Sequence, residues 1–259
     1  MSLSHLIGKN IQLLIGGLKF AEKYEDEIIE RHKDITFKPI FIIGLPRSGS
    51  TLLYQLMIRH FRLTYFSNLA SVFYKYPVSI SQYFINKQKS YVLEKYESEY
   101  GVTKGLYAPS EAGRIFRFWF SNDCSTGKRK IKKSISALSN IYGRPFIWKN
   151  LNLSFHVKII SEIFHNPLFI LINRDMRFIC QSIYLSTFDS KNININGLSN
   201  RDLYDGKDVL EKIARRICKI DKKIKKNLVL HSNNYIEIQY SDLCNNLPKT
   251  LELISSKYD

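Results

Sequence analysis

The chain has 259 residues, of which 44% are hydrophobic, and 39 Lys and Arg side chains outweigh 23 Asp and Glu to give a net charge of +16. This composition supplies enough apolar residues for the core of one α/β domain. The scattered cysteines without a CxxC pair argue against a disulfide framework or a zinc site, and the lack of an apolar run of ~20 residues argues against a membrane span. The charge predicts attraction to polyanions without choosing among nucleic acid, an acidic polymer and a phosphorylated cofactor.

The N-terminal segment, residues 1–36, is expected to form an amphipathic helix that packs on the domain. Its apolar residues Ile11, Leu14, Ile15 and Leu18 recur at helical spacing, and acidic residues occupy its second half. The segment lacks the pattern of a cleavable signal, and the isolated cysteines fit a reducing compartment. We therefore expect a cytoplasmic protein.

A buried strand and a glycine-rich turn follow. The continuous apolar run from Ile40 to Ile43 is typical of a parallel strand buried on both faces. The turn Gly44 to Thr51 reads GLPRSGST, and apolar residues recur at helical spacing from Ser50 onward. Backbone N–H groups and the positive end of a helix dipole converge on such a turn, where Ser50 and Thr51 add hydroxyl donors. The segment predicts a phosphate-binding site, with an ordinary strand-to-helix turn as the alternative.

The position of the cation in this turn bears on the reaction. A nucleotide triphosphatase places Lys directly after the second glycine of the turn, whereas Ser50 stands there in this chain and Arg47 lies inside the turn. A sulfuryl group carries a single negative charge, so fixed cations and amides can stabilise its transfer without a metal ion. A kinase-like phosphotransferase that lacks the loop Lys remains the alternative enzyme.

The middle of the chain, residues 63–142, is rich in Tyr, Phe and Trp. It is expected to be mostly helical, with breaks near Pro77, from Gly101 to Pro109 and from Asp123 to Gly127. We interpret it as a helical lid or acceptor-binding region. Glu111 stands in a loop ahead of an aromatic helix, where it can act as a general base or cap the first turn of that helix.

Three further strands complete the predicted sheet. They are Phe146 to Trp148, Phe169 to Ile172 and Tyr235 to Ile238, the last followed by a helix that opens near Leu247. There is no internal repeat. The pattern predicts one α/β domain with a doubly wound, P-loop-like parallel sheet flanked by helices, and with the aromatic-rich middle as a helical insertion.

Two basic clusters, residues 128–133 and 219–226, supply much of the positive charge. The second has Ile217, Ile220 and Ile224 on one face at helical spacing, which favours a solvated helix surface. A non-catalytic polyanion-binding protein that uses these clusters is the third possible function.

Two elements of the sequence together resemble the sulfotransferase superfamily. Pro46 to Thr51 is similar to its 5'-phosphosulfate loop, P-[RK]-[ST]-G-[ST]-[ST], in the Arg form of the bacterial and tyrosylprotein-type branches. The strand that ends in Arg174-Asp-Met-Arg177, with Ser182 one helix later, resembles its 3'-phosphate element, in which Pro is usual where Met176 stands. The Arg174 guanidinium can donate two hydrogen bonds to a phosphate, and the Ser182 hydroxyl can donate a third. The alternative is a salt bridge at the end of the strand to the neighbouring Asp.

Two weaker matches extend the resemblance to about residues 37–253. The strand that ends at Lys149 looks like a family strand just upstream of the 3' element, and Tyr240-Ser-Asp242-Leu243 looks like the end of a late family strand. The resemblance implies metal-independent, in-line transfer of a sulfuryl group from 3'-phosphoadenosine 5'-phosphosulfate to a hydroxyl acceptor. The product of the donor is then adenosine 3',5'-bisphosphate. The sequence leaves the acceptor open among a carbohydrate, a lipid, a peptide and a small phenol or other small molecule, and no nucleic acid is expected as a partner.

The resemblance assigns roles to individual residues. The expected donor-binding residues are Arg47, Ser48, Gly49, Ser50, Thr51, Leu52, Arg174 and Ser182. The expected catalytic residues are Arg47, Lys149, Glu111 and His156, the last two as alternative bases because the family supplies a Glu or a His for that step. For His156 a purely structural role is the other interpretation, and no residue is expected to bind a metal ion.

Overall fold

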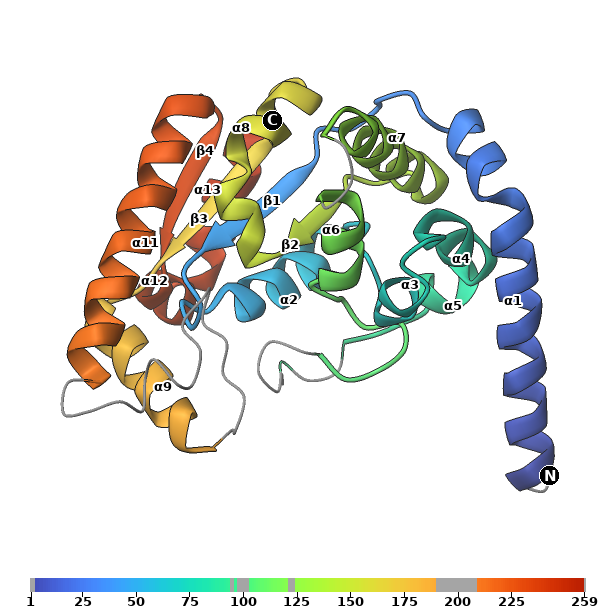
Figure 1. Cartoon of the computed structure of the whole chain (residues 1–259), viewed down its shortest axis with the longest axis horizontal. Coiled ribbons are helices and arrows are strands. Elements are labelled where there is room, and N and C mark those ends of the chain that lie inside the picture. The colour runs from blue at the N-terminus through green and yellow to red at the C-terminus, as the bar shows by residue number, and fades with distance from the viewer. Residues whose placement is uncertain (1–2, 94–95, 97–102, 121–123, 190–208, 259) are drawn as a thin grey trace. The chain divides into compact units, whose positions relative to one another are not determined.

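The computed structural model describes residues 3–93, 96, 103–120, 124–189 and 209–258 (Figure 1). The chain alternates helices and strands, as an α/β protein does. No helix in this described part of the chain is long and apolar enough to cross a membrane.

Four strands form one sheet in the order β2-β1-β3-β4. Their bounds are β1 Ile40–Gly44, β2 Ile147–Lys149, β3 Leu168–Asn173 and β4 Tyr235–Gln239. These bounds confirm the four predicted strands, and every end lies within one residue of its predicted position. β3 and β4 pair in parallel, with Ile170 opposite Ile236.

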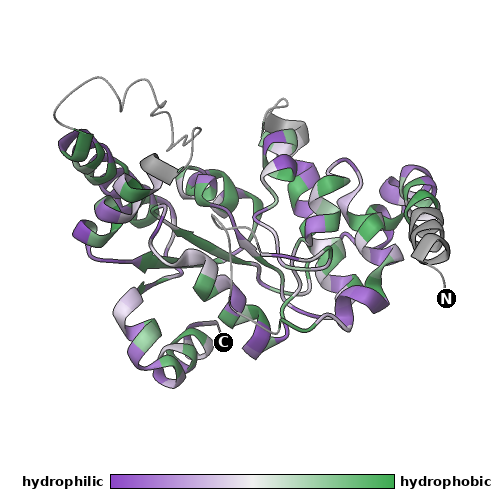
Figure 2. Cartoon of the chain, turned by 90° about the horizontal axis from the view of Figure 1, so that it is seen from below, coloured by the Kyte–Doolittle hydropathy of each residue, from purple (hydrophilic) through white to green (hydrophobic). Residues whose placement is uncertain are grey.

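The burial of each strand follows from its place in the sheet. β1 is buried throughout and β3 almost throughout, and both occupy interior positions, as their continuous apolar runs predict. In the edge strand β4 only Ile236 and Ile238 are buried, while Glu237 and Gln239 are exposed. Figure 2 shows the strands as largely hydrophobic, with helices that are hydrophobic on one face. The predicted α/β class with a parallel sheet is therefore confirmed.

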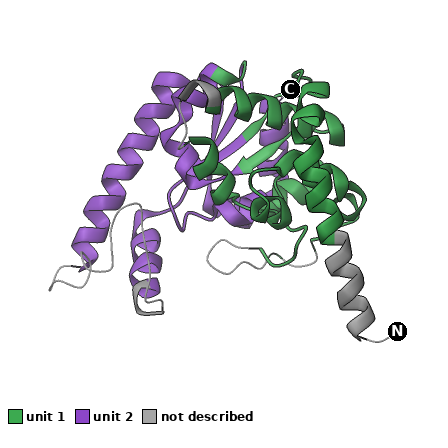
Figure 3. Ribbon diagram, turned by 45° about the vertical axis from the view of Figure 1, so that its right-hand side comes forward, with its two compact units in different colours: residues 1–40, 55–148, 163–165 green, residues 41–54, 149–162, 166–259 purple. Residues whose placement is uncertain are grey.

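The described residues divide by their contacts into two compact units, coloured separately in Figure 3. Unit 1 comprises residues 1–40, 55–148 and 163–165, and unit 2 comprises residues 41–54, 149–162 and 166–259. The chain thus leaves unit 2 after Tyr54 and returns to it at Lys149.

Unit 2 contains β3, β4 and the helices around them. These are the 3-10 helix η1 (Leu151–Phe155), α9 (Met176–Asp189), α11 (Val209–His231), α12 (Tyr240–Asn245), α13 (Leu247–Tyr258) and most of α8 (Val157–Ile163). α11 buries Ile213, Ile217, Ile220, Ile224 and Leu228, so its lysines lie on the outer surface, as the sequence predicts. The short helix α12, which begins directly after β4, was not expected from the sequence.

Unit 1 is mainly helical. Its helices are α1 (Leu3–Arg31), most of α2 (Ser50–Phe61), α3 (Asn68–Val72), α4 (Pro77–Tyr83), α5 (Ile85–Lys89), α6 (Gly113–Phe120) and α7 (Cys124–Tyr142). The break predicted at Asp123 to Gly127 is wrong from Cys124 onward, because α7 is helical there. The core of the unit includes edge-to-face contacts of Phe66 with the rings of Trp119, Phe146 and Trp148, at centroid distances of 5.6, 4.8 and 5.1 Å. The large aromatic rings of the middle of the sequence therefore contribute to the packed core of unit 1.

A buried carboxylate joins α1 to α4 within this unit. Glu25 accepts hydrogen bonds from the backbone N–H groups of Val78 and Ser79, at 3.2 and 2.7 Å, and from the Ser79 hydroxyl. These amides belong to the first turn of α4, where helices leave N–H groups unpaired. Burial raises the pKa of the Glu25 carboxyl above its usual range. The N-terminal helix is therefore fixed by a polar contact as well as by its apolar face.

Candidate functional site

The candidate site lies in unit 2, where the turn between β1 and α2 (Ser50–Phe61) meets the ends of the neighbouring strands. Gly44 closes β1 with a φ of 150°, and an added Cβ there would lie 2.9 Å from the carbonyl oxygen of Ile172 in β3. The Ser154 hydroxyl lies 3.2 Å from the Gly44 nitrogen and 3.4 Å from its oxygen. The start of the turn is therefore held against β3 and η1, and only glycine fits this backbone position.

Arg47 and Ser182 are in direct contact, although they lie far apart in the sequence. Arg47, with an unusual positive φ of 65°, points its side chain so that Nε donates to the Ser182 hydroxyl at 2.9 Å. Arg174 donates from Nη1 to the Arg47 carbonyl oxygen at 3.0 Å. Three residues that the sequence assigned to two separate phosphate groups thus form one hydrogen-bonded cluster.

The acidic residue beside Arg174 caps the helix that carries Ser182. The Asp175 carboxylate accepts a hydrogen bond from the Arg177 backbone N–H at 2.9 Å and from its guanidinium at 2.5 Å. These bonds hold the pKa of Asp175 at about 2, because they favour the ionised form. Asp175 therefore orients the first turn of α9 and pairs with Arg177, while the Arg174 guanidinium reaches the turn after β1.

Lys149 brings a third cation to the turn, after Arg47 and Arg174. It is the last residue of β2 and is only 2% exposed, yet its ammonium donates to Thr51 Oγ1 at 3.1 Å. Because burying an ammonium costs free energy unless it is paired or hydrogen-bonded, this position calls for acceptors around it. A buried Lys whose Nζ reaches the first turn of α2 puts positive charge where the phosphate loop begins its helix.

The residues between Arg47 and Leu52 complete the turn. Ser48 is fully buried, and its hydroxyl has no hydrogen-bond partner among the described residues. Ser50 is buried, whereas Thr51 and Leu52 are half-buried at the start of α2. An unpaired buried hydroxyl beside a helix N-terminus fits a site that completes its hydrogen bonds with an anion. The donor set is therefore suited to a phosphate-bearing ligand.

Tyr240 also belongs to this site, in a role that the sequence did not reveal. It opens α12 directly after β4, and its ring lies 4.4 Å from the guanidinium carbon of Arg174, measured to the ring centroid. A Cβ added to Gly49 would lie 2.3 Å from Tyr240 Cδ2. The Tyr-x-Asp-Leu pattern was visible in the sequence, but only the fold shows what its tyrosine contacts.

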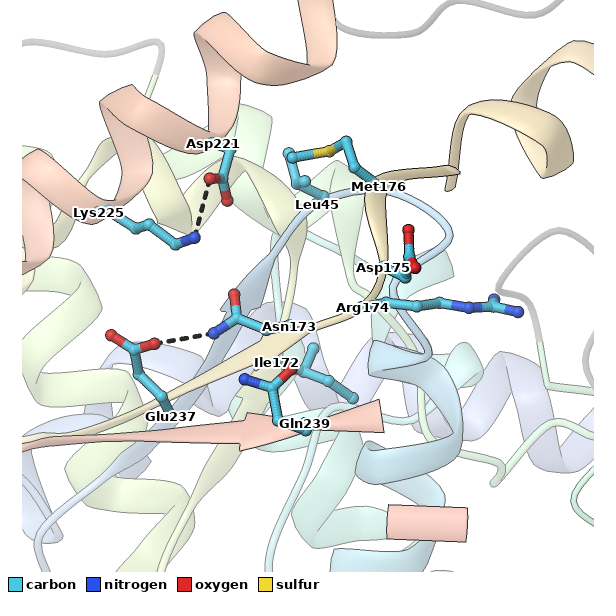
Figure 4. Close-up of a pocket in the computed structure, with 10 residues that line it drawn as sticks. All are labelled: Leu45, Ile172, Asn173, Arg174, Asp175, Met176, Asp221, Lys225, Glu237 and Gln239. Atoms are coloured by element: carbon cyan, nitrogen blue, oxygen red, sulfur yellow. Dashed lines mark hydrogen bonds and ion pairs between the residues drawn. The ribbon is translucent and has the colours of Figure 1, made fainter. Parts of the chain in front are cut away.

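A cavity of about 300 Å³ adjoins the same strand ends (Figure 4). Its lining carries three carboxylates, those of Asp175, Asp221 and Glu237, and the cations Arg174 and Lys225. Figure 4 shows that the Arg174 side chain extends away from the Asp221–Lys225 pair of α11. The acidic excess disfavours a phosphate in this cavity, whereas the Arg174 guanidinium reaches the turn after β1.

The two candidate bases lie in different units. Glu111 is half-buried in unit 1, two residues before α6, and its carbonyl oxygen accepts a hydrogen bond from Trp148 Nε1 at 3.0 Å. His156 is half-buried in unit 2 at the end of η1, where its Nδ1 lies 2.9 Å from the Asn152 carbonyl oxygen. His156 is thus engaged in a local backbone contact, and Glu111 remains the first candidate. Within the described ranges, no group of three or more His, Cys, Asp or Glu side chains could hold a metal ion.

Comparison with known proteins adds independent findings. A model of the sulfotransferase family matches residues 39–258. The structure is similar to the crystal structure of sulfotransferase STF9 from Mycobacterium avium, with a TM-score of 0.61 at 12% identity over 92% of this chain and 68% of that chain. It is also similar to sulfotransferase STF1 from Mycobacterium tuberculosis H37Rv, with a TM-score of 0.56 at 15% identity over 96% and 76% of the two chains. A search of curated proteins finds no match. The two structural likenesses establish a shared fold, and the family match extends over most of the sequence.

Proposed function

The chain belongs to the sulfotransferase family, and from this we propose that it transfers a sulfuryl group from 3'-phosphoadenosine 5'-phosphosulfate to a hydroxyl group of an acceptor. The observation that carries the proposal is the cluster of Arg47, Arg174 and Ser182, in which the turn after β1 is hydrogen-bonded to the residue that follows β3 and to α9. A ligand with phosphate groups on both sides of a ribose matches such a cluster, because each group needs its own cation and hydroxyl donors.

Each part of the site has a proposed task. The backbone N–H groups of the turn and the hydroxyls of Ser48, Ser50 and Thr51 bind the 5' end of the donor, and Leu52 begins the helix beneath it. Arg174 and Ser182 bind the 3'-phosphate. When bound, the donor supplies an activated sulfuryl group on a phosphate leaving group.

The proposed chemistry needs charge stabilisation and proton removal. Arg47 and Lys149 stabilise the negative charge that grows on the leaving oxygen as the bond to sulfur breaks. Glu111 accepts the proton of the acceptor hydroxyl as that oxygen forms its bond to sulfur. Two fixed cations suffice for a group of single charge, so we propose that no metal ion takes part.

The acceptor and the setting of the enzyme are also proposals. We assign the acceptor to the helical region of residues 63–142, and we expect a carbohydrate or another small hydroxyl compound. The described cysteines Cys180, Cys218 and Cys244 are free thiols, which supports a reducing compartment such as the cytoplasm.

Nucleotide-induced thermal stabilisation tests the proposed function. At a hundred times its Kd, adenosine 3',5'-bisphosphate without metal should raise the melting temperature by about 5 °C, because binding to the folded state contributes about 2.7 kcal/mol. Stabilisation by ATP with magnesium alone would support a phosphotransferase instead. A response to neither nucleotide would favour a polyanion-binding protein, and dextran sulfate then serves as its probe.

Replacement of Arg174 tests the assignment of the 3'-phosphate site. Arg174→Ala should weaken binding of adenosine 3',5'-bisphosphate by about tenfold to a hundredfold, because a charge-assisted fork contributes about 1.5–3 kcal/mol. Binding of adenosine 5'-phosphate, which lacks the 3' group, should fall much less in the same calorimetric titration. Arg177→Ala removes an 87% exposed cation from the same helix start and should leave the bisphosphate affinity nearly unchanged. Equal losses for the two nucleotides in Arg174→Ala would remove Arg174 from the 3'-phosphate site.

Replacement of Glu111 separates chemistry from binding. Glu111→Gln keeps the shape of the side chain but removes its basicity, so turnover should fall about 10²-fold or more. The affinity for adenosine 3',5'-bisphosphate should stay close to that of the wild type, because Glu111 has no part in the proposed donor site. An unchanged rate would return Glu111 to a structural role, and His156→Gln would then be the next variant to assay.

A further inference from the structure

The position of the Tyr240 ring connects two elements that come from different strands. On one side it lies against Gly49, because an added Cβ there would be 2.3 and 2.5 Å from its Cδ2 and Cε2 atoms. These distances are shorter than any ordinary carbon–carbon contact, so the ring occupies the space that a side chain at position 49 would need. The turn after β1 therefore approaches the ring with its backbone.

On another side the same ring faces Arg174. The guanidinium carbon lies 4.4 Å from the ring centroid, well within the range of a cation–π contact. Arg174 also donates to the Arg47 carbonyl oxygen at 3.0 Å. A guanidinium held by a cation–π contact keeps its N–H groups available for the turn and for an anion.

Tyr240 is itself fixed at both ends. Its backbone leaves β4 at Gln239, which pairs with Asn173 of β3, the residue directly before Arg174. Its hydroxyl lies beside the Cys244 thiol of α12, which raises the pKa of Tyr240 above its usual range. A ring held by a strand register and by its own helix is a rigid reference for the groups that pack on it.

We infer that Tyr240 is a positioning residue that sets the separation between the Gly44 to Thr51 turn and the guanidinium of Arg174. The inference rests on the proposed function, because this separation matters for a ligand that carries phosphate groups at both its 5' and 3' ends. Such a ligand must meet both elements at once, and a shift of either one breaks a contact. A ligand with a single phosphate group at its 5' end meets only the turn.

A positioning role for Tyr240 can be distinguished from a role in which its ring stacks directly on the nucleotide base. Loss of a base contact weakens every adenine nucleotide by the same factor. Loss of a positioning contact weakens the bisphosphate selectively, and its effect disappears once Arg174 is gone. The number of phosphate groups on the ligand therefore separates the two roles.

The experiment measures the Kd of adenosine 3',5'-bisphosphate and of adenosine 5'-phosphate by calorimetry for the wild type and for Tyr240→Met, which keeps bulk but has no ring. The bisphosphate should bind about tenfold more weakly to Tyr240→Met and the monophosphate less than about threefold, as expected for a partly buried cation–π contact. Tyr240→Phe keeps the ring and should restore the bisphosphate affinity. In the Arg174→Ala background, Tyr240→Met should cause little further loss.

Controls make each outcome decisive. Tyr235→Met, at the other end of β4, should leave both affinities unchanged and reports any general effect of altering this strand. If Tyr240→Met does not fold, the smaller Tyr240→Leu gives the same comparison. Equal losses for the two nucleotides, failure of Tyr240→Phe to restore binding, or additive losses in the double variant would overturn the inference while leaving sulfuryl transfer intact. Wild-type protein that binds neither nucleotide would overturn the proposed function, and the inference with it.

Discussion

Replacing Lys149 with Met should lower the turnover number about 10²- to 10³-fold, the loss seen when one preorganised donor to a developing charge is removed. Met fills much of the space of the Lys stem at this 2% exposed position, so the variant removes the ammonium without opening a large cavity. The Kd of adenosine 3',5'-bisphosphate should rise far less than turnover falls, because a cation at the leaving oxygen acts mainly in the transition state. Single-turnover kinetics and calorimetry provide the two measurements.

Arg47→Ala provides the matched comparison. It should lower turnover by a similar factor, and the double variant should lose less than the product of the two single losses, because both cations act on one charge. Lys158→Met, on α8 of the same unit, controls for the loss of a lysine outside the site. Strictly multiplicative losses, or a Lys149→Met variant that changes only the Kd, would leave Arg47 as the one cation assigned to the transition state.

Gly49→Ala should weaken adenosine 3',5'-bisphosphate binding about 100-fold or more, since a displacement of about 1 Å in a positioned site has consequences of that size. Gly49 has a φ of 94°, a conformation that L residues avoid, and its added methyl group would overlap the Tyr240 ring at 2.3 Å. Either the turn or the ring must move to relieve this overlap, and movement of the ring would weaken its cation–π contact with Arg174.

A second glycine separates the effect of backbone strain at a positive φ from the effect of overlap with the Tyr240 ring. Gly143 has a φ of 64°, yet a Cβ there meets no atom of the described residues within 4 Å. Gly143→Ala should therefore lower only the melting temperature, through a backbone strain of about 1–2 kcal/mol, and leave nucleotide affinity unchanged. If the two variants behave alike in the binding titration, the contact with Tyr240 does not govern the turn.

The strands and the phosphate turn could be predicted from the sequence because each is encoded by a short, continuous stretch of residues. The run Ile40 to Ile43 is continuous and apolar, so only a strand buried on both faces accommodates it. Likewise, two glycines and Ser-Thr at a strand-to-helix boundary predict a phosphate turn whatever the rest of the chain does. The resemblance to the sulfotransferase superfamily implied that Arg174 and Ser182 lie near the turn, and the structure adds their bonds to Arg47.

The remaining site contacts depend on packing between distant segments, which no local pattern encodes. Ser154 bonds to Gly44 across 110 residues, and nothing around Ser154 distinguishes it from other serines in short helices. Tyr240 was noticed as part of a motif, but its contacts with Gly49 and Arg174 depend on the register of β4 against β3. The catalytic base is hardest to identify, because Glu111 and the phosphate turn lie in different units.

The path of the chain out of unit 2 and back also bears on how such enzymes diversify. Residues 55–148 form one excursion, and it ends at Lys149, whose ammonium is hydrogen-bonded to Thr51 just before the excursion begins. Because the two ends of the excursion are held together by this bond, lengthening it adds only an entropic free-energy cost of loop closure, which grows with the logarithm of its length. Insertions and deletions within this segment therefore cost the rest of the fold little, provided that Ile147 and Trp148 remain in β2. Under this arrangement, the length of the excursion can change during evolution while Gly44 to Thr51, Arg174 and Tyr240 keep their places.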